Sequence, residues 1–139
     1  MLRVVIDVNV FVSALLRRGS VPAGVLHAWE SGLYELVASD ALLDELAPVL
    51  RREHIARRIA PDAASDLLAL IRSDAVLAAD PPPARHVPSD PDDDYLVTLA
   101  LTVGAQAIVT GDAALLALDL ELQRILTPRD FLLAIESSA

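Results

Sequence analysis

The sequence predicts a single three-layer α/β domain over residues 1–139: a parallel sheet of four or five strands with helices on both faces. Three observations support this fold class. Short Val- and Ile-rich runs that are apolar on both faces are typical of buried parallel strands. These runs alternate with segments of helical periodicity, as in parallel sheets with crossover helices. The chain has 139 residues, 54% of them hydrophobic and only 4% aromatic, which suits one domain with an aliphatic core.

The first part of the chain contains two predicted strands with two helices between them. An apolar run ends abruptly at Asp7, and Gly32 ends the second helix before the next apolar run begins. The four elements span residues 2–6, 10–17, 23–31 and 34–38.

Helical periodicity dominates the middle of the chain. From Asp40 onward, five apolar residues fall on one helical stripe: Leu42, Leu43, Leu46, Val49 and Leu50. Further helices are predicted at 63–77 and 91–103, the second ending at Gly104. Between them, segment 80–91 contains five of the nine prolines and is predicted to be an extended loop.

The end of the chain alternates strand and helix again. Short apolar runs separated by Gly, Asp and Pro predict strand, helix, strand and helix in that order. These elements span residues 107–110, 115–118, 123–126 and 128–136.

Charge and composition exclude several classes of protein. The chain has 20 acidic and 11 basic residues, a net charge of −9, and every basic residue is Arg. The lack of Lys excludes receiver domains, haloacid-dehalogenase phosphatases and P-loop NTPases. The lack of Cys excludes thiolate metal sites, and the acidic balance argues against unspecific nucleic-acid binding. With no signal peptide and no apolar segment of about 20 residues, we expect a cytoplasmic protein that does not enter membranes.

Two predicted strands end in an aspartate. Asp7 closes the first strand, and Asp112 follows the third. Ligands of parallel α/β folds bind at the carboxyl ends of strands, near the switch in strand order, so both acids are candidate site residues. Taken one at a time, each is more simply explained as the N-cap of the next helix, and this alternative stays open.

Helical geometry, at about 100° per residue, selects further acids. Glu45 lies at the edge of the buried stripe of its helix, where it can enter a cleft, whereas Asp44 faces solvent. In the later helix, Asp92 and Asp93 lie beside the buried face, and Asp94 is predicted to lie nearly opposite it. A capped helix N-terminus with acids near its positive end also accounts for these first-turn residues.

Several carboxylates at one edge of a sheet would repel each other and raise their own pKa values unless a cation lies among them. Oxygen ligands without Cys or His favour Mg²⁺ or Mn²⁺, and His27, His54 and His86 match no metal-ligand spacing. Such sites activate water and stabilise the leaving oxygen in phosphodiester hydrolysis. The residues therefore predict a divalent-metal nuclease.

Four motifs together resemble the PIN domain family. They are Asp7-Val8-Asn9, Glu45 within segment 44–50, Asp90-Pro91-Asp92-Asp93-Asp94, and Ile108-Val109-Thr110-Gly111-Asp112. Segment 125–132 is similar to the end of such domains, so the resemblance covers essentially the whole chain. More narrowly, the chain is similar to small prokaryotic PIN proteins that are toxins of type II toxin–antitoxin pairs.

The resemblance implies a ribonuclease that cleaves single-stranded RNA with Mg²⁺ or Mn²⁺. It assigns the catalytic and metal-binding quartet to Asp7, Glu45, Asp93 and Asp112. Asn9 and Thr110 match the family's polar helpers, and Asp92 is a further supporting polar residue. Many members carry a second acid where this chain has Ala114, which leaves open whether one or two metal ions bind.

Partners and rival functions are also expectations at this stage. Arg17, Arg18, Arg51 and Arg52 are candidate RNA contacts, although a solvated helix face is the commoner meaning of such runs. The resemblance implies a cognate antitoxin and a homodimer, for which the apolar segment 21–33 is a candidate face. Two alternatives stay open: a non-catalytic PIN scaffold that binds RNA or a partner protein, favoured by Ala114 and the acidic surface, and a DNA nuclease with the same site.

Overall fold

A computed structural model describes the backbone of residues 1–82, 91–120 and 123–138, with the side chains of these residues except 91–93 and 138. Within these segments the chain forms a parallel sheet of five strands in the order β3-β2-β1-β4-β5, which confirms the predicted α/β fold. The strands are β1 (Arg3–Ile6), β2 (Glu35–Ala38), β3 (Val76–Leu77), β4 (Ala107–Val109) and β5 (Arg124–Leu126). Since β2 and β4 flank β1 on opposite sides, the switch in strand order lies between β1 and β4.

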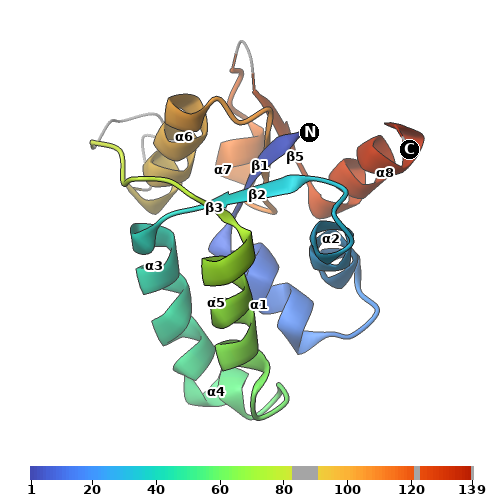
Figure 1. Cartoon of the computed structure of the whole chain (residues 1–139), viewed down its shortest axis with the longest axis vertical. Coiled ribbons are helices and arrows are strands. Elements are labelled where there is room, and N and C mark those ends of the chain that lie inside the picture. Colours follow the sequence, from blue (N-terminus) through green and yellow to red (C-terminus); the bar gives the residue numbers. More distant parts are fainter. Residues whose placement is uncertain (83–90, 121–122, 139) are drawn as a thin grey trace.

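Helices cover both faces of this sheet. They are α1 (Val8–Leu16), α2 (Val21–Glu30), α3 (Asp40–Arg51), α4 (Glu53–Ala56), α5 (Ala63–Asp74), α6 (Pro91–Val103), α7 (Ala113–Leu116) and α8 (Pro128–Ser138). Figure 1 shows α6 on one face, where it packs on β1 and β4, and α1, α2, α3 and α5 on the other. In the segments that the structure describes, no helix is both long and apolar enough to cross a membrane.

The central strand is buried on both faces, as its apolar sequence predicts. Val4, Val5 and Ile6 are fully inaccessible to solvent. Farther out, the Tyr34 ring meets Phe131 of α8 edge-on, with ring centres 5.0 Å apart. The buried Tyr34 hydroxyl donates to the Val25 carbonyl at 2.7 Å.

The predicted helix at 63–77 is wrong at its end. Helix α5 stops at Asp74, and Val76–Leu77 form the edge strand β3. Val76 pairs with Val37, and the Ala78 N–H donates to the Ala38 carbonyl at 2.8 Å. Pairing with the exposed edge of β2 therefore outweighs the helical pattern of this segment.

The remaining predicted elements are present, with ends shifted by up to two residues. Helix α1, for example, begins at Val8 because Asp7 caps it. The short helix α4 had no separate prediction. Most of the predicted loop at 80–91 lies outside the described residues.

Part of the apolar segment 21–33, the candidate dimer face, packs within the protomer. Helix α2 packs against α1 and α8, which buries Val25, Leu26 and Trp29. Val21 and Leu33 remain exposed at its two ends.

Candidate active site

The sheet brings the ends of β1 and β4 side by side. The Asp7 N–H donates to the Val109 carbonyl at 2.9 Å, so backbone pairing continues beyond β1. Thr110 follows directly after β4, and Asp112 comes two residues later. The two strand-end acids thus lie at the same edge of the sheet, at the switch in strand order.

Asp7 is a buried carboxylate, with only 7% of its surface exposed. Its Oδ1 accepts a hydrogen bond from the Asn9 N–H at 3.1 Å, which caps α1. Its Oδ2 accepts a hydrogen bond from the Thr110 hydroxyl at 2.8 Å. Charged acceptors form the stronger hydrogen bonds of proteins, so these two contacts fix the carboxylate plane.

Thr110 links the two acids. It is fully buried, and its Oγ1 both donates to Asp7 and accepts the Asp112 N–H at 3.0 Å. The Asp112 side chain is half-buried, and its Oδ1 accepts hydrogen bonds from the Ala114 and Leu115 N–H groups at 2.8 and 3.4 Å. Asp7, Thr110 and Asp112 therefore form one connected polar group.

Both strand-end acids are N-caps, as the simpler alternative predicted. Asp7 caps α1 and Asp112 caps α7. Capping uses only the Oδ1 atom of each, and a carboxylate has about four lone-pair sites. The capping role thus leaves oxygen positions on both side chains for a ligand.

The acids on helix α3 lie as predicted. Glu45 is half-buried, whereas Asp44 is exposed. Glu45 therefore stands at the border of the buried stripe that contains Leu42 and Leu46.

The prediction for Asp94 is wrong. Rather than pointing away from the core, it is only 3% exposed. The prediction assumed one buried stripe, but α6 also buries Val97, Thr98 and Leu99 next to β1 and β4. A helix that is buried over most of its circumference has no single apolar face from which to measure.

Asp92 and Asp93 lie in the first turn of α6, and their side chains are outside the described residues. The structure therefore places Asp7, Glu45 and Asp112 of the predicted quartet. Among the side chains that it describes, no group of three acids or histidines is close enough together to hold a metal ion. The complete quartet stays a prediction.

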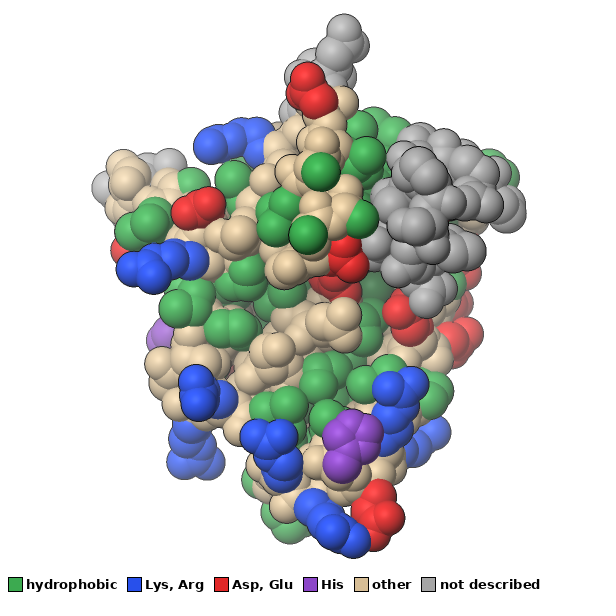
Figure 2. All heavy atoms as spheres, turned by 180° about the vertical axis from the view of Figure 1, so that it is seen from behind, with side chains coloured by type: hydrophobic (Ala, Val, Ile, Leu, Met, Phe, Trp, Pro, Cys, Tyr) green, Lys and Arg blue, Asp and Glu red, His purple; other side chains and the backbone are tan. Residues whose placement is uncertain are grey.

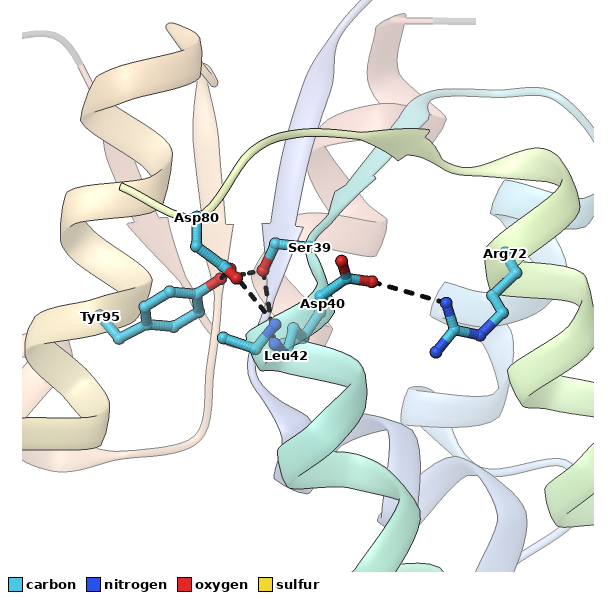
Figure 3. Close-up of polar contacts among 7 residues, drawn as sticks. Ser39, Asp40, Leu42, Arg72, Asp80 and Tyr95 are labelled. Atoms are coloured by element: carbon cyan, nitrogen blue, oxygen red, sulfur yellow. Dashed lines mark hydrogen bonds and ion pairs between the residues drawn. The ribbon is translucent and has the colours of Figure 1, made fainter. Parts of the chain in front are cut away.

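Sequence reasoning missed a polar junction at the start of α3, shown in Figure 3. The Tyr95 hydroxyl of α6 donates to Asp80 Oδ1 at 2.9 Å and also hydrogen bonds with the Ser39 hydroxyl. Ser39 is fully buried and caps α3 by accepting the Leu42 N–H. The Ala41 N–H donates to Asp80 Oδ1 at 3.2 Å. The N-cap of Ser39 is visible in the sequence, but its tie to Tyr95 is not.

The junction shifts the pKa values of two of its members. Burial, the hydrogen bond to Asp80 and the nearby carboxylates, Glu45 among them, raise the pKa of Tyr95. Desolvation acts to raise the pKa of Asp80, but hydrogen bonds from Tyr95, Ala41 and Ser39 outweigh it and lower that pKa below its ordinary value. At neutral pH Tyr95 is thus a protonated donor and Asp80 an ionised acceptor.

The start of α3 also has an ion pair on its other side. Arg72 of α5 lies 3.5 Å from the Asp40 carboxylate, and both side chains are largely exposed (Figure 3). Exposed pairs contribute little to stability, so this contact is a minor part of the junction.

The candidate RNA contacts lie on the surface. Arg17 and Arg18 follow α1, and Arg51 and Arg52 end α3; all four are exposed. Figure 2 shows basic side chains and a histidine gathered at the lower end of the molecule, where Figure 1 places α4. In the described part of the chain, no carboxylate lies within 4.0 Å of these four arginines.

Two solved structures that are similar to this chain are distant from it in sequence. The crystal structure of PAE2754 from Pyrobaculum aerophilum is similar with a TM-score of 0.66 and 20% identity, over 98% of this chain and 90% of that one. The crystal structure of VapC20 from Mycobacterium tuberculosis, described as a sarcin-ricin loop cleaving toxin, has a TM-score of 0.47 and 18% identity, over 84% of this chain and 89% of that one. No curated protein matches the chain. Residues 3–114 match the family described as PIN domain, which is most of the chain. The chain therefore belongs to the PIN domain family.

Proposed function

We propose that this PIN domain is a divalent-metal-dependent endoribonuclease that cleaves single-stranded RNA, and that it is the toxin of a toxin–antitoxin pair. One observation carries the proposal: the buried Thr110 hydroxyl joins Asp7 to the backbone of Asp112 at the strand-order switch. A polar group of this kind is costly to bury, and it lies where α/β folds bind their ligands. Membership of the PIN domain family supports the nuclease reading.

The proposed donor set fits Mg²⁺ or Mn²⁺. Its members are the carboxylates of Asp7, Glu45, Asp93 and Asp112. Hard oxygen ligands of this kind suit these two cations, and the capping bonds leave lone pairs available on Asp7 and Asp112. When bound, the metal activates water and stabilises the oxygen that leaves in phosphodiester hydrolysis.

The surrounding residues orient this donor set. Thr110 donates to Asp7 Oδ2 and so holds one carboxylate in a fixed plane. Asn9 is exposed at the start of α1, two residues after Asp7, where its side chain can contact the scissile phosphate or water. We assign Asp92 a supporting polar role beside Asp93.

The net charge of −9 requires a basic surface to attract RNA. Arg17, Arg18, Arg51 and Arg52 are exposed and unpaired with carboxylates in the described segments, so their guanidinium groups are available for phosphates. We propose them as the RNA contacts, which makes binding salt-sensitive. A cognate antitoxin and a homodimer complete the proposal, although α2 is largely buried within the protomer.

The test is cleavage of total RNA and of defined single-stranded RNA and DNA with Mn²⁺, Mg²⁺ or EDTA. We expect RNA cleavage to need metal and to decrease in Asp7→Asn and Asp93→Asn. Loss of a residue that only hydrogen bonds to a metal ligand can lower activity about 100-fold, and we expect the loss of a ligand itself to exceed this. Asp44→Asn, at the exposed neighbour of Glu45, is the matched control and retains activity. Without metal, Asp7→Asn is expected to melt at the same temperature as wild type or higher, because Asn still caps α1 and removes a buried charge.

A non-catalytic PIN scaffold is the second candidate. Ala114 in the first turn of α7 favours it, because the family resemblance implies a second acid there. Metal that raises the melting temperature without cleavage of any RNA would establish the scaffold. Cleavage of DNA but not RNA would identify a DNA nuclease, and absence of any metal effect would refute the carboxylate site itself.

A further inference from the structure

We propose that Tyr95 is a positioning residue of this site, whose hydroxyl holds α6 against the capped N-terminus of α3 through Ser39 and Asp80. The inference rests on the proposed function, since its purpose is to set the spacing between acids on two different helices. No contact of Tyr95 with substrate or metal is required.

The junction connects three separate parts of the chain. Ser39 follows β2 and caps α3, Asp80 follows β3, and Tyr95 belongs to α6. Sequence separations of 56 residues between Ser39 and Tyr95, and of 15 between Asp80 and Tyr95, show that tertiary packing creates these contacts.

On the α3 side, the junction is held by hydrogen bonds to the backbone of the helix. Two N–H groups of its first turn are bound by side chains: that of Leu42 by Ser39 at 3.3 Å and that of Ala41 by Asp80 at 3.2 Å. A carboxylate at this position also suits the positive end of the helix dipole. Because both acceptors also bond with Tyr95, the Tyr95 hydroxyl attaches α6 to the start of α3 itself.

This attachment lies next to the proposed acids on both helices. Glu45 is four residues after Ala41, one turn along the same side of α3. On α6, Asp93 precedes Tyr95 by two residues, within the first turns of the helix. Small movements of α6 relative to α3 would therefore change the distance between the two acids.

The ring and the hydroxyl of Tyr95 have separable roles. The ring is half-buried and packs against the hydrophobic core, which Phe can do equally well. Without the hydroxyl, Ser39 and Asp80 still cap α3, and only the attachment of α6 is lost. Tyr95→Phe thus tests positioning with little change in packing.

The experiment measures the Mn²⁺ concentration that gives half of the maximal rise in melting temperature, and separately the Mn²⁺ dependence of RNA cleavage. For Tyr95→Phe we expect both concentrations to increase about tenfold, as when an outer partner of a metal ligand is lost. Tyr34→Phe is the matched control, because its buried hydroxyl bonds to the Val25 carbonyl and the residue lies at the amino end of β2, whereas the strand-end acids follow the carboxyl ends. It is expected to lower the metal-free melting temperature and leave both Mn²⁺ concentrations unchanged.

A second variant tests the shared junction. Asp80→Ala, at an exposed position, is expected to shift the Mn²⁺ concentration less than Tyr95→Phe does. In the double variant the shift should be smaller than the product of the two single shifts, because each change breaks the same connection.

The outcomes separate the inference from the proposed function. Unchanged Mn²⁺ concentrations in Tyr95→Phe, with a wild type that binds metal and cleaves RNA, would overturn the positioning role alone. A reduced melting temperature in EDTA with no Mn²⁺ shift would do the same, because it reveals a merely structural hydroxyl. A wild type that neither binds Mn²⁺ nor cleaves RNA would overturn both proposals.

Discussion

The proposed site has two halves that are built differently. In the sheet half, Asp7 and Asp112 follow neighbouring strands, and the backbone pairing of β1 with β4 sets their separation. In the helix half, Glu45 and Asp93 belong to α3 and α6, which share no backbone ladder. There the connection passes through the side chains of the Ser39–Asp80–Tyr95 junction.

This difference shows where each half is vulnerable. The sheet half is fixed by hydrogen bonds that the fold requires in any case, together with one buried hydroxyl. The helix half depends on a partly exposed junction, in which Asp80 is open to solvent. We therefore expect the loss of a hydrogen bond in the sheet half to affect both stability and activity, and changes in the helix half to act mainly on metal binding.

The largest effect on folding is expected from Thr110→Val in the sheet half. Valine has the same shape, but it leaves the Asp112 N–H without its acceptor and Asp7 Oδ2 without its donor. Loss of a buried hydrogen bond to a charged group costs about 1.5–3 kcal/mol, so urea unfolding should show a decrease of that size. Cleavage should fall as well, because Asp7 loses its orientation.

Thr102→Val on α6 is the control for that measurement. Its hydroxyl donates to the Thr98 carbonyl at 2.8 Å, but the residue is exposed. Its free energy of unfolding should stay within about 0.5 kcal/mol of wild type. An equal decrease in the free energy of unfolding of the two variants would show that the Thr110 hydroxyl does not specifically stabilise the sheet half.

A smaller effect on stability should distinguish capping from catalysis at Asp112. Asp112→Asn keeps an oxygen acceptor for the Ala114 and Leu115 N–H groups, whereas Asp112→Ala removes it. Chemical denaturation should show a cost of about 1 kcal/mol for Ala and little for Asn. Cleavage should be lost in both variants. If Asp112→Asn still cleaves RNA, Asp112 acts only as the N-cap of α7.

The smallest effect is expected from the pH dependence of Asp80 in the helix half. Hydrogen bonds hold its pKa in the folded protein below the ordinary value of 3.8. A carboxyl group with a lowered pKa stabilises the fold above its unfolded-state pKa, and this stabilisation is lost as the pH falls through the folded value. The difference in melting temperature between wild type and Asp80→Asn should thus be constant from pH 7 to about 5 and shrink below about 4. A difference that is unchanged at pH 3 would contradict the assignment.

The same contrast explains what could be predicted from the sequence. Apolar runs ending in Asp7 and Asp112 predicted parallel strands, and parallel strands present their carboxyl ends at one edge. One helical stripe was enough to separate Glu45 from Asp44. It failed for Asp94, because α6 is buried on more than one side.

Other features depend on contacts between distant segments. The strand Val76–Leu77 exists because an edge of β2 is available, which the local helical pattern does not reveal. Asp80 and Tyr95 likewise gain their partners only when β3 and α6 meet the start of α3. The sequence around each of these two residues does not predict these contacts.

The position of β1 in the middle of the sheet has a consequence for biosynthesis. Strand β1 is made long before its neighbour β4, and the hydrogen bond between Thr110 and Asp7 joins residues 103 positions apart. Contacts of such long range form late, since a large loop must close before they contribute. A growing chain that has not reached residue 112 has one acid of the sheet half without the other, so the chemistry of the site arises only after residue 112 has been added.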